Sequence, residues 1–133
     1  MVNKIHIATN AAPPAVGTYS QAIRTGDLVF VTGQTGRDPE TGKLEEGLEA
    51  QTRRMLSNIE AVLNAAGCAP DDIVSSTLLM TDIKYFKAID VIYAAWLPPR
   101  DVIPLPACNA CVVAGLPAGA LVMLEVVAAV PRD

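Results

Sequence analysis

Basic residues are scarce in this sequence, and they are scattered. Of its 133 residues, 10 are Lys or Arg and 14 are Asp or Glu, which gives a formal net charge of −4. Arg53 and Arg54 are the only adjacent basic residues. A groove for nucleic acid or a contact with an anionic membrane surface needs clustered positive charge. We therefore expect neither nucleic acid nor a membrane as a partner.

Metal ligands and long apolar runs are equally sparse. The cysteines are Cys68, Cys108 and Cys111, and the one histidine is His6, which is too few in any one stretch for a zinc site. No apolar run approaches the ~20 residues that span a bilayer. The first ten residues, MVNKIHIATN, contain no apolar signal core. These features predict a cytoplasmic protein without a metal.

Apolar spacing and turn residues predict an α+β chain. Residues 48–66 and 86–97 carry apolar side chains at helical spacing, and Gly67 and Pro98 follow them as stop signals. Strand-like stretches are residues 5–7, 28–31, 73–81, 107–114 and 121–130. This order favours one sheet with both helices on one face. No internal linker interrupts the chain, so we expect a single domain over residues 1–133.

The last predicted strand, LVMLEVVAAV, carries one carboxylate, Glu125, in an otherwise apolar run. If helices cover one face of the sheet, Glu125 and its apolar neighbours Met123 and Val127 lie on the other face, which no helix covers. An ionised carboxylate is costly to bury without a partner. We expect the second face to pack against another subunit, with Glu125 at or near the contact. Burial of the strand by a long loop is the alternative.

The segment GLPAG between the last two predicted strands is typical of a hairpin turn. A turn centred on residues 116–117 would place Cys108 directly opposite Glu125, with both side chains on one face. A bulge in the turn would shift this register. The hairpin therefore allows a thiol beside the carboxylate but does not require it.

Four stretches, in order along the chain, resemble the Rid (reactive-intermediate deaminase, YjgF-like) family. They are APPAVGTYSQA at residues 12–22, VTGQTGRDPETGKL at 31–44, QTRRMLSNIEAVLNAAG at 51–67, and a C-terminal run from PAC at 106–108 through LP at 116–117 to Glu125. The chain is similar to that family over essentially its whole length.

The resemblance implies a chorismate-mutase-like α+β fold, assembled as a homotrimer around a central β-barrel with clefts between subunits. It implies hydrolysis of reactive enamines and imines, such as 2-aminoacrylate, to a keto acid and ammonia, with no metal or organic cofactor. In that scheme Glu125 positions or activates the attacking water. Tyr19, Thr32 and the backbone of Gly33 line the substrate pocket.

One departure from the family changes the expected substrate. Typical members carry an arginine directly after Pro-Ala that binds the substrate carboxylate as a bidentate pair, and this chain has Cys108 there. A helical asparagine of the family is replaced by Asp90. Loss of a buried charge-assisted pair costs about 2–5 kcal/mol. We therefore expect a substrate that is not anchored as a typical 2-imino acid, unless Arg100 compensates from an inward-folded loop.

Three functions fit these residues. The first is a Rid-like deaminase acting on a neutral or differently anchored enamine or imine. The second is a hydrolase with Cys108 as nucleophile and Glu125 as proton carrier, although Cys108 could also merely fill the space of the arginine. The third is a non-catalytic trimer that binds a small metabolite or a partner protein. The catalytic candidates are Glu125 and Cys108, and the substrate-binding candidates are Tyr19, Thr32, Gly33 and Asp90.

Overall fold

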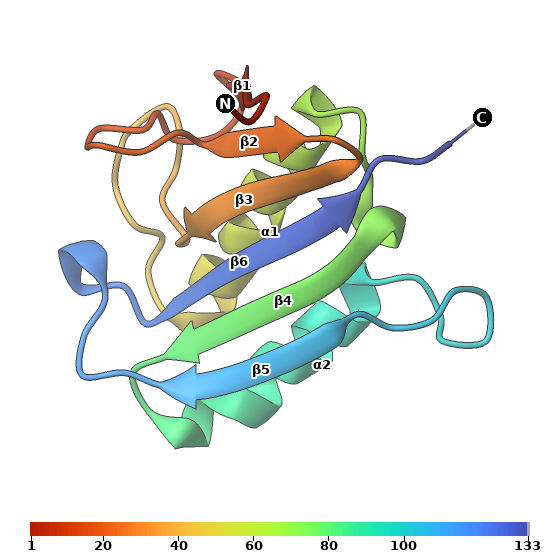
Figure 1. Ribbon diagram of the computed structural model, residues 1–133. Coiled ribbons are helices and arrows are strands. Elements are labelled where there is room, and N and C mark those ends of the chain that lie inside the picture. The colour runs from red at the N-terminus through yellow and green to blue at the C-terminus, as the bar shows by residue number, and fades with distance from the viewer. Residues whose placement is uncertain (133) are drawn as a thin grey trace.

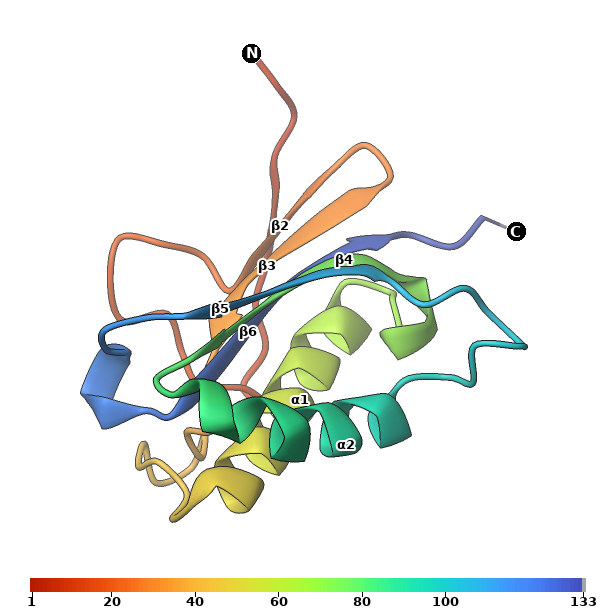
Figure 2. The same cartoon turned by 90° about the horizontal axis from the view of Figure 1, so that it is seen from below.

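A computed structural model describes residues 1–132 and contains a six-stranded mixed sheet with two α-helices (Figure 1). The strands are β1 (Ile5–Ile7), β2 (Ala22–Thr25), β3 (Leu28–Gln34), β4 (Ile73–Met80), β5 (Ala107–Val112) and β6 (Val122–Ala129). They lie in the order β1-β2-β3-β6-β4-β5. Helices α1 (Leu48–Ala65) and α2 (Phe86–Trp96) cover one face and leave the other open (Figure 2). The predicted α+β class, with both helices on one face, is confirmed.

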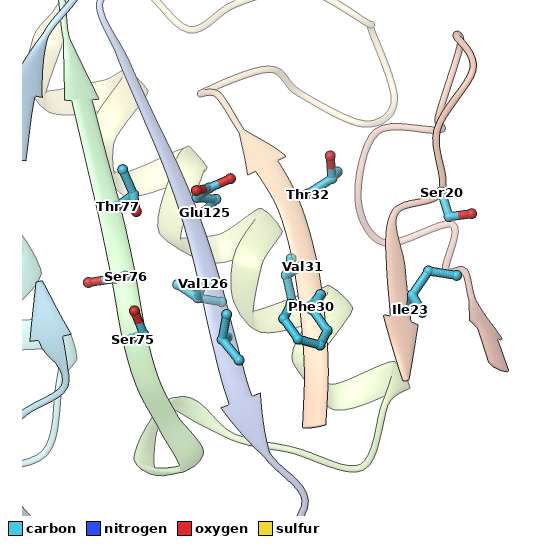
Figure 3. Close-up of a pocket in the computed structure, with 11 residues that line it drawn as sticks. Ser20, Ile23, Phe30, Val31, Thr32, Ser75, Ser76, Thr77, Glu125 and Val126 are labelled. Atoms are coloured by element: carbon cyan, nitrogen blue, oxygen red, sulfur yellow. The ribbon is translucent and has the colours of Figure 1, made fainter. Parts of the chain in front are cut away.

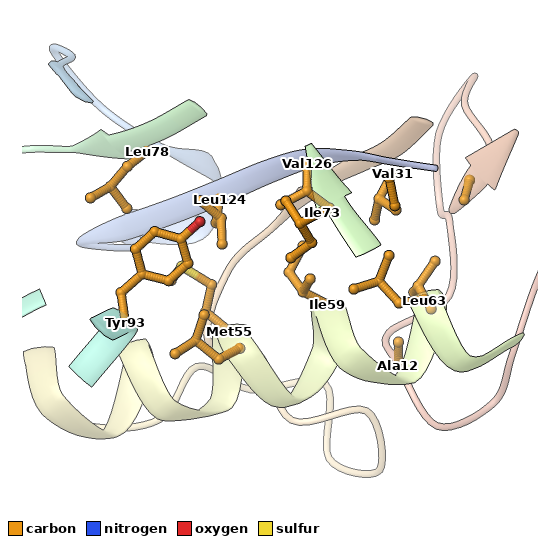
Figure 4. Packing of buried hydrophobic residues seen from close by; sticks show 14 of the residues in the cluster. Ala12, Val31, Met55, Ile59, Leu63, Ile73, Leu78, Tyr93, Leu124 and Val126 are labelled. Carbon is orange, nitrogen blue, oxygen red and sulfur yellow. The ribbon is translucent and has the colours of Figure 1, made fainter. Parts of the chain in front are cut away.

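Helix α1 is held against the sheet by its apolar side. Met55, Ile59 and Leu63 are fully buried at helical spacing, and they face Leu124 and Val126 of β6 (Figure 4). Full burial of one such side chain contributes about 1.5–3 kcal/mol relative to exposure. The core therefore lies between α1 and the centre of the sheet, where β6 lies between β3 and β4.

Both helices begin and end close to the predicted residues. After α1 the chain passes through Gly67, whose φ of 79° is in the left-handed region that glycine adopts without a steric cost. Helix α2 ends at Trp96, shortly before Pro98, because the residue before a proline is disfavoured in a helix. Within the described residues, neither helix is both long and apolar enough to cross a membrane.

The predicted hairpin of residues 107–114 with 121–130 is wrong. Strand β4 lies between β5 and β6, pairing in parallel with β5 and antiparallel with β6. A parallel β4–β5 pair needs a crossover, which α2 supplies. The LPAG turn then carries the chain past β4 instead of reversing it tightly. Strand β2 is also absent from the predicted set of strands.

This topology separates the two catalytic candidates. Cys108 of β5 pairs with Ser76, whereas Glu125 of β6 pairs with Thr77, the next residue of β4. Successive side chains of a strand point to opposite faces. The expected juxtaposition of Cys108 with Glu125 is therefore wrong: Cys108 is on the helix-covered face and Glu125 is on the open face.

The open face of the sheet is apolar around Glu125. On β6, Val122, Leu124, Val126 and Ala128 are buried under the helices, so Met123, Glu125 and Val127 point from the open face, as the sequence predicts. On β3, Leu28 and Phe30 share that face and remain 40% and 46% exposed. An apolar surface of this kind marks a place for another molecule to pack.

Candidate functional site

Glu125 lies in a cavity of about 360 Å³ on the open face of the sheet. Figure 3 shows its carboxylate between Thr77 of β4 and Thr32 of β3. Ser20 and Ser75 add two further hydroxyls to the lining, while Phe30 and Val127 supply apolar walls. The carboxylate is exposed, which removes the burial cost that its apolar strand suggests. It is placed to accept protons from water or from a bound molecule.

The three residues that the Rid resemblance assigns to the substrate pocket lie together in a neighbouring cavity of about 320 Å³. Tyr19, Thr32 and Gly33 line it, as the resemblance implies, but Glu125 does not. Met123, two residues earlier on the same face of β6, lines the cavity instead. Thr32 is shared by the two cavities, which makes them neighbours along β3.

Gln21 fixes the loop that carries Tyr19. Its buried side chain accepts from the backbone N–H of Thr9 at 2.7 Å and donates to the carbonyl of Pro13 at 2.8 Å. The backbone carbonyl of Gln21 accepts a hydrogen bond from the backbone N–H of Thr32 at 2.9 Å, which ties the loop to β3. Buried amide groups with all partners satisfied hold a segment in one geometry. Gln21 is thus a positioning residue, and it is absent from the predicted site residues although it belongs to the YSQA motif.

Asn58 fixes another wall of the Tyr19 cavity by side-chain hydrogen bonds. It is fully buried in α1, and its Nδ2 donates to the carbonyls of Thr35 and Arg37 at 3.0 and 2.8 Å. Thr35 and Arg37 both line the Tyr19 cavity. Helix α1 therefore sets the position of that wall.

A third cavity, of about 270 Å³, contains Cys108 and Asp90 on the helix side of the sheet. Arg100 also lines it, so its loop does fold toward the position of the missing arginine. Tyr93 closes one side, where burial raises the pKa of its phenol and its hydroxyl donates to Ser76 Oγ at 2.9 Å. The structure thus brings Cys108 and Asp90 together and keeps both apart from Glu125 of the same subunit.

Cys108 and Cys111 form a CxxC pattern that is easily mistaken for a redox or metal motif. Both lie on strand β5, three residues apart, so their side chains point to opposite faces of the sheet. In the part of the chain that the structure describes, no group of three His, Cys, Asp or Glu side chains could hold a metal ion.

A sequence model of the family described as Endoribonuclease L-PSP matches residues 9–130. A crystal structure of RidA from an Antarctic Psychrobacter species superposes with a TM-score of 0.89 at 40% identity, covering 94% of this chain and 98% of that one. The chain belongs to the Rid family. The chorismate-mutase-like fold implied by the resemblance is confirmed.

Two curated relatives of this Rid-family chain have names that state an activity. Reactive Intermediate Deaminase A, chloroplastic, of Arabidopsis thaliana is 39% identical over 128 residues, which are 96% of this chain and 66% of that protein. The 2-iminobutanoate/2-iminopropanoate deaminase of Rattus norvegicus is 37% identical over 123 residues, 92% of this chain and 87% of that protein. Because one relative is named chloroplastic, the cytoplasmic location of this chain stays a prediction.

Proposed function

We propose that this chain is a Rid-type hydrolase that releases ammonia from a small reactive enamine or imine. The relatives named as deaminases support the reaction class. The observation that carries the proposal is the Glu125 carboxylate in an open-face cavity lined by the hydroxyls of Ser20, Thr32, Ser75 and Thr77. Although the family description names an endoribonuclease, the sparse and scattered basic residues do not favour a nucleic-acid substrate.

The chemistry needs one group that accepts a proton and gives it back. An enamine first gains a proton on carbon and loses one from nitrogen, which makes it an imine. Glu125 then removes a proton from water as the water oxygen bonds to the imine carbon. The C=N π electrons go to nitrogen, which takes the proton from Glu125 and so gives a carbinolamine. Glu125 then carries the hydroxyl proton of the carbinolamine to nitrogen, the C–N bond breaks, and C=O forms as ammonia leaves. A carboxylate is suited to both transfers, and such catalysis contributes about 10²–10⁴-fold.

The substrate is proposed to lack the carboxylate anchor of a 2-imino acid. Cys108 supplies no cation, and Asp90 lines the same cavity with a negative charge. Among the described residues that line that cavity, Arg100 is the one cation, and Asp90 offsets its charge. A neutral imine therefore suits this chain better than an anionic one.

The assembly is proposed to be a homotrimer with a central β-barrel. Its support is the family resemblance together with the apolar open face that carries Phe30 and Leu28. Cys108 and Glu125 lie on opposite faces of one sheet. They could therefore share a site only across a subunit boundary, which a trimer would create.

Replacing Cys108 by alanine separates the proposal from a thiol mechanism. A water-based deaminase should keep its rate of ammonia release within about twofold, because no bond forms to sulfur. The measurement is ammonia release from an imine generated in situ, with the Cys111→Ala variant as the matched control. Abolition of activity in Cys108→Ala alone would instead support Cys108 as the nucleophile.

A non-catalytic binding function is the second candidate, and one observation favours it. Among the described residues that line the Tyr19 cavity there is no Asp or Glu, and the side chain nearest Gly33 is that of Met123. If substrates bind only in that cavity, no acid there could carry protons. The activity of the Glu125 variant described in the Discussion distinguishes the two functions.

A further inference from the structure

A row of polar side chains crosses the open face of the sheet at the level of Glu125. In the antiparallel pair of β4 with β6, Thr77 lies directly opposite Glu125. In the parallel pair of β4 with β5, Thr77 is aligned with Asn109. Residues that are paired in this way on neighbouring strands share one face of the sheet. Thr77 and Asn109 therefore lie on the face that carries Glu125.

The rows on either side of this polar row are mostly apolar. They consist of Met123, Leu79 and Cys111 on one side and of Val127, Ser75 and Ala107 on the other. Thr77 is thus the residue of β4 that the register places directly beside the carboxylate. Because β4 and β6 are neighbours in one sheet, this pairing does not depend on what packs against the open face.

Covering the open face changes what Glu125 needs. In the single subunit the carboxylate is exposed, so water can bind to it. In the proposed trimer another subunit removes part of that water, and an ionised carboxylate must then accept hydrogen bonds from the protein. Thr77 is half-buried, and the Cβ atoms of directly opposed residues are only ~5 Å apart. Figure 3 shows the two side chains on adjacent strands.

We propose that Thr77 is a positioning residue of the hydrolytic site: its hydroxyl donates a hydrogen bond to Glu125 and holds the carboxylate where it removes a proton from water. This inference rests on the proposed function. A hydroxyl has one proton to donate, and a carboxylate is a stronger acceptor than a neutral group. The amide of Asn109, on the other side of Thr77, donates to the hydroxyl oxygen, so the hydroxyl proton is directed to Glu125.

Replacing Thr77 by valine removes the hydroxyl and keeps the β-branched shape that suits a strand. Ammonia release is measured at several concentrations of an imine formed in situ, which separates kcat from KM. We expect kcat to fall about tenfold and KM to change less than about twofold, because a misplaced catalytic group slows the reaction without weakening substrate binding. Thr77→Ser, which keeps the hydroxyl, should retain kcat within about threefold of the wild type.

Thr81→Val is the matched control. Thr81 directly follows β4 and lines none of the three cavities described above, so its variant should keep the wild-type kcat. Thr77→Ala, which also lacks the hydroxyl, serves if Thr77→Val does not fold. An unchanged kcat in the variant without the hydroxyl, or a Thr77→Ser protein as slow as that variant, would overturn the role of Thr77.

The double variant Thr77→Val/Glu125→Gln tests whether Thr77 acts through Glu125. If it does, Thr77→Val should slow the Glu125→Gln protein by less than about twofold, because residues that act as a unit are not additive. A full tenfold loss in both backgrounds would show that Thr77 acts independently of the carboxylate, which would contradict the inference.

A measurement without catalysis separates this inference from the proposed function. The side-chain carboxyl carbon of Glu125, labelled with ¹³C and assigned by its loss in Glu125→Gln, has an NMR resonance that depends on hydrogen bonding. The resonance should shift in Thr77→Val and stay in place in Thr77→Ser and Thr81→Val. An unshifted resonance in Thr77→Val would overturn the hydrogen bond, whatever the activity. The expected shifts in a protein that hydrolyses no imine would overturn the proposed function alone.

Discussion

Replacing Glu125 by glutamine is expected to slow imine hydrolysis by at least about a hundredfold. Glutamine keeps the size and the hydrogen-bonding ability of the side chain but cannot accept a proton from water. General acid–base groups contribute about 10²–10⁴-fold, and the structure offers Glu125 as the one carboxylate in its cavity among the described residues. Ammonia release from an imine formed in situ by a flavin-dependent amine oxidase, corrected for spontaneous hydrolysis, measures the effect.

Glu46→Gln is the matched control for this substitution. Glu46 is an exposed residue in the segment before α1 and lines none of the three cavities. Its variant should keep the wild-type rate, and both variants should keep the wild-type melting temperature, because Glu125 is itself exposed. A Glu125→Gln protein that retains wild-type activity would remove the carboxylate from the mechanism.

The second large effect is expected from a charge placed on the open face of the sheet. Phe30 lies opposite Val127 on that face, is 46% exposed, and lines the Glu125 cavity. If the face packs against another subunit, Phe30→Glu buries an unpaired carboxylate there, which is strongly unfavourable. We expect the variant to be monomeric and to lose most of its activity, while the wild type is a trimer. Size-exclusion chromatography with light scattering gives the molecular mass of both.

Val91→Glu provides the matched control for the assembly. Val91 is 67% exposed on α2, and Figure 2 shows that this helix lies on the face of the sheet opposite the open one. The same charge placed there should leave the oligomer and the activity unchanged. A wild-type protein that is a stable monomer would contradict the proposed trimer, and a Phe30→Glu variant that stays trimeric would show that another surface forms it.

Local patterns along the chain predict a large part of this fold. The helical spacing from Leu48 predicts α1 because its apolar side chains from Met55 to Leu63 are buried in the core, and on α2 Ile89 and Tyr93 are buried at the same spacing. The two faces of β6 also follow from the sequence, because period-two alternation is a local property of a strand. Tyr19, Thr32 and Gly33 meet in one cavity, as their motifs imply.

Strand order and register could not be predicted from local patterns. The GLPAG segment has the composition of a tight turn, yet β4 is inserted between the strands that it joins. That insertion moves Cys108 away from Glu125, because one step in register reverses the face. The contact of Met123 with Gly33 is missed for the same reason, since it depends on how β3 pairs with β6 around a bulge.

The rate at which the wild-type protein releases ammonia from a neutral imine tests the account most directly. The imine formed from benzylamine by an amine oxidase should be hydrolysed well above its spontaneous rate. The 2-imino acid formed from alanine by an amino-acid oxidase should be accelerated less, because Cys108 supplies no cation for its carboxylate. No acceleration of either compound would contradict the account and favour a binding protein, and strong preference for the 2-imino acid would contradict the proposed specificity.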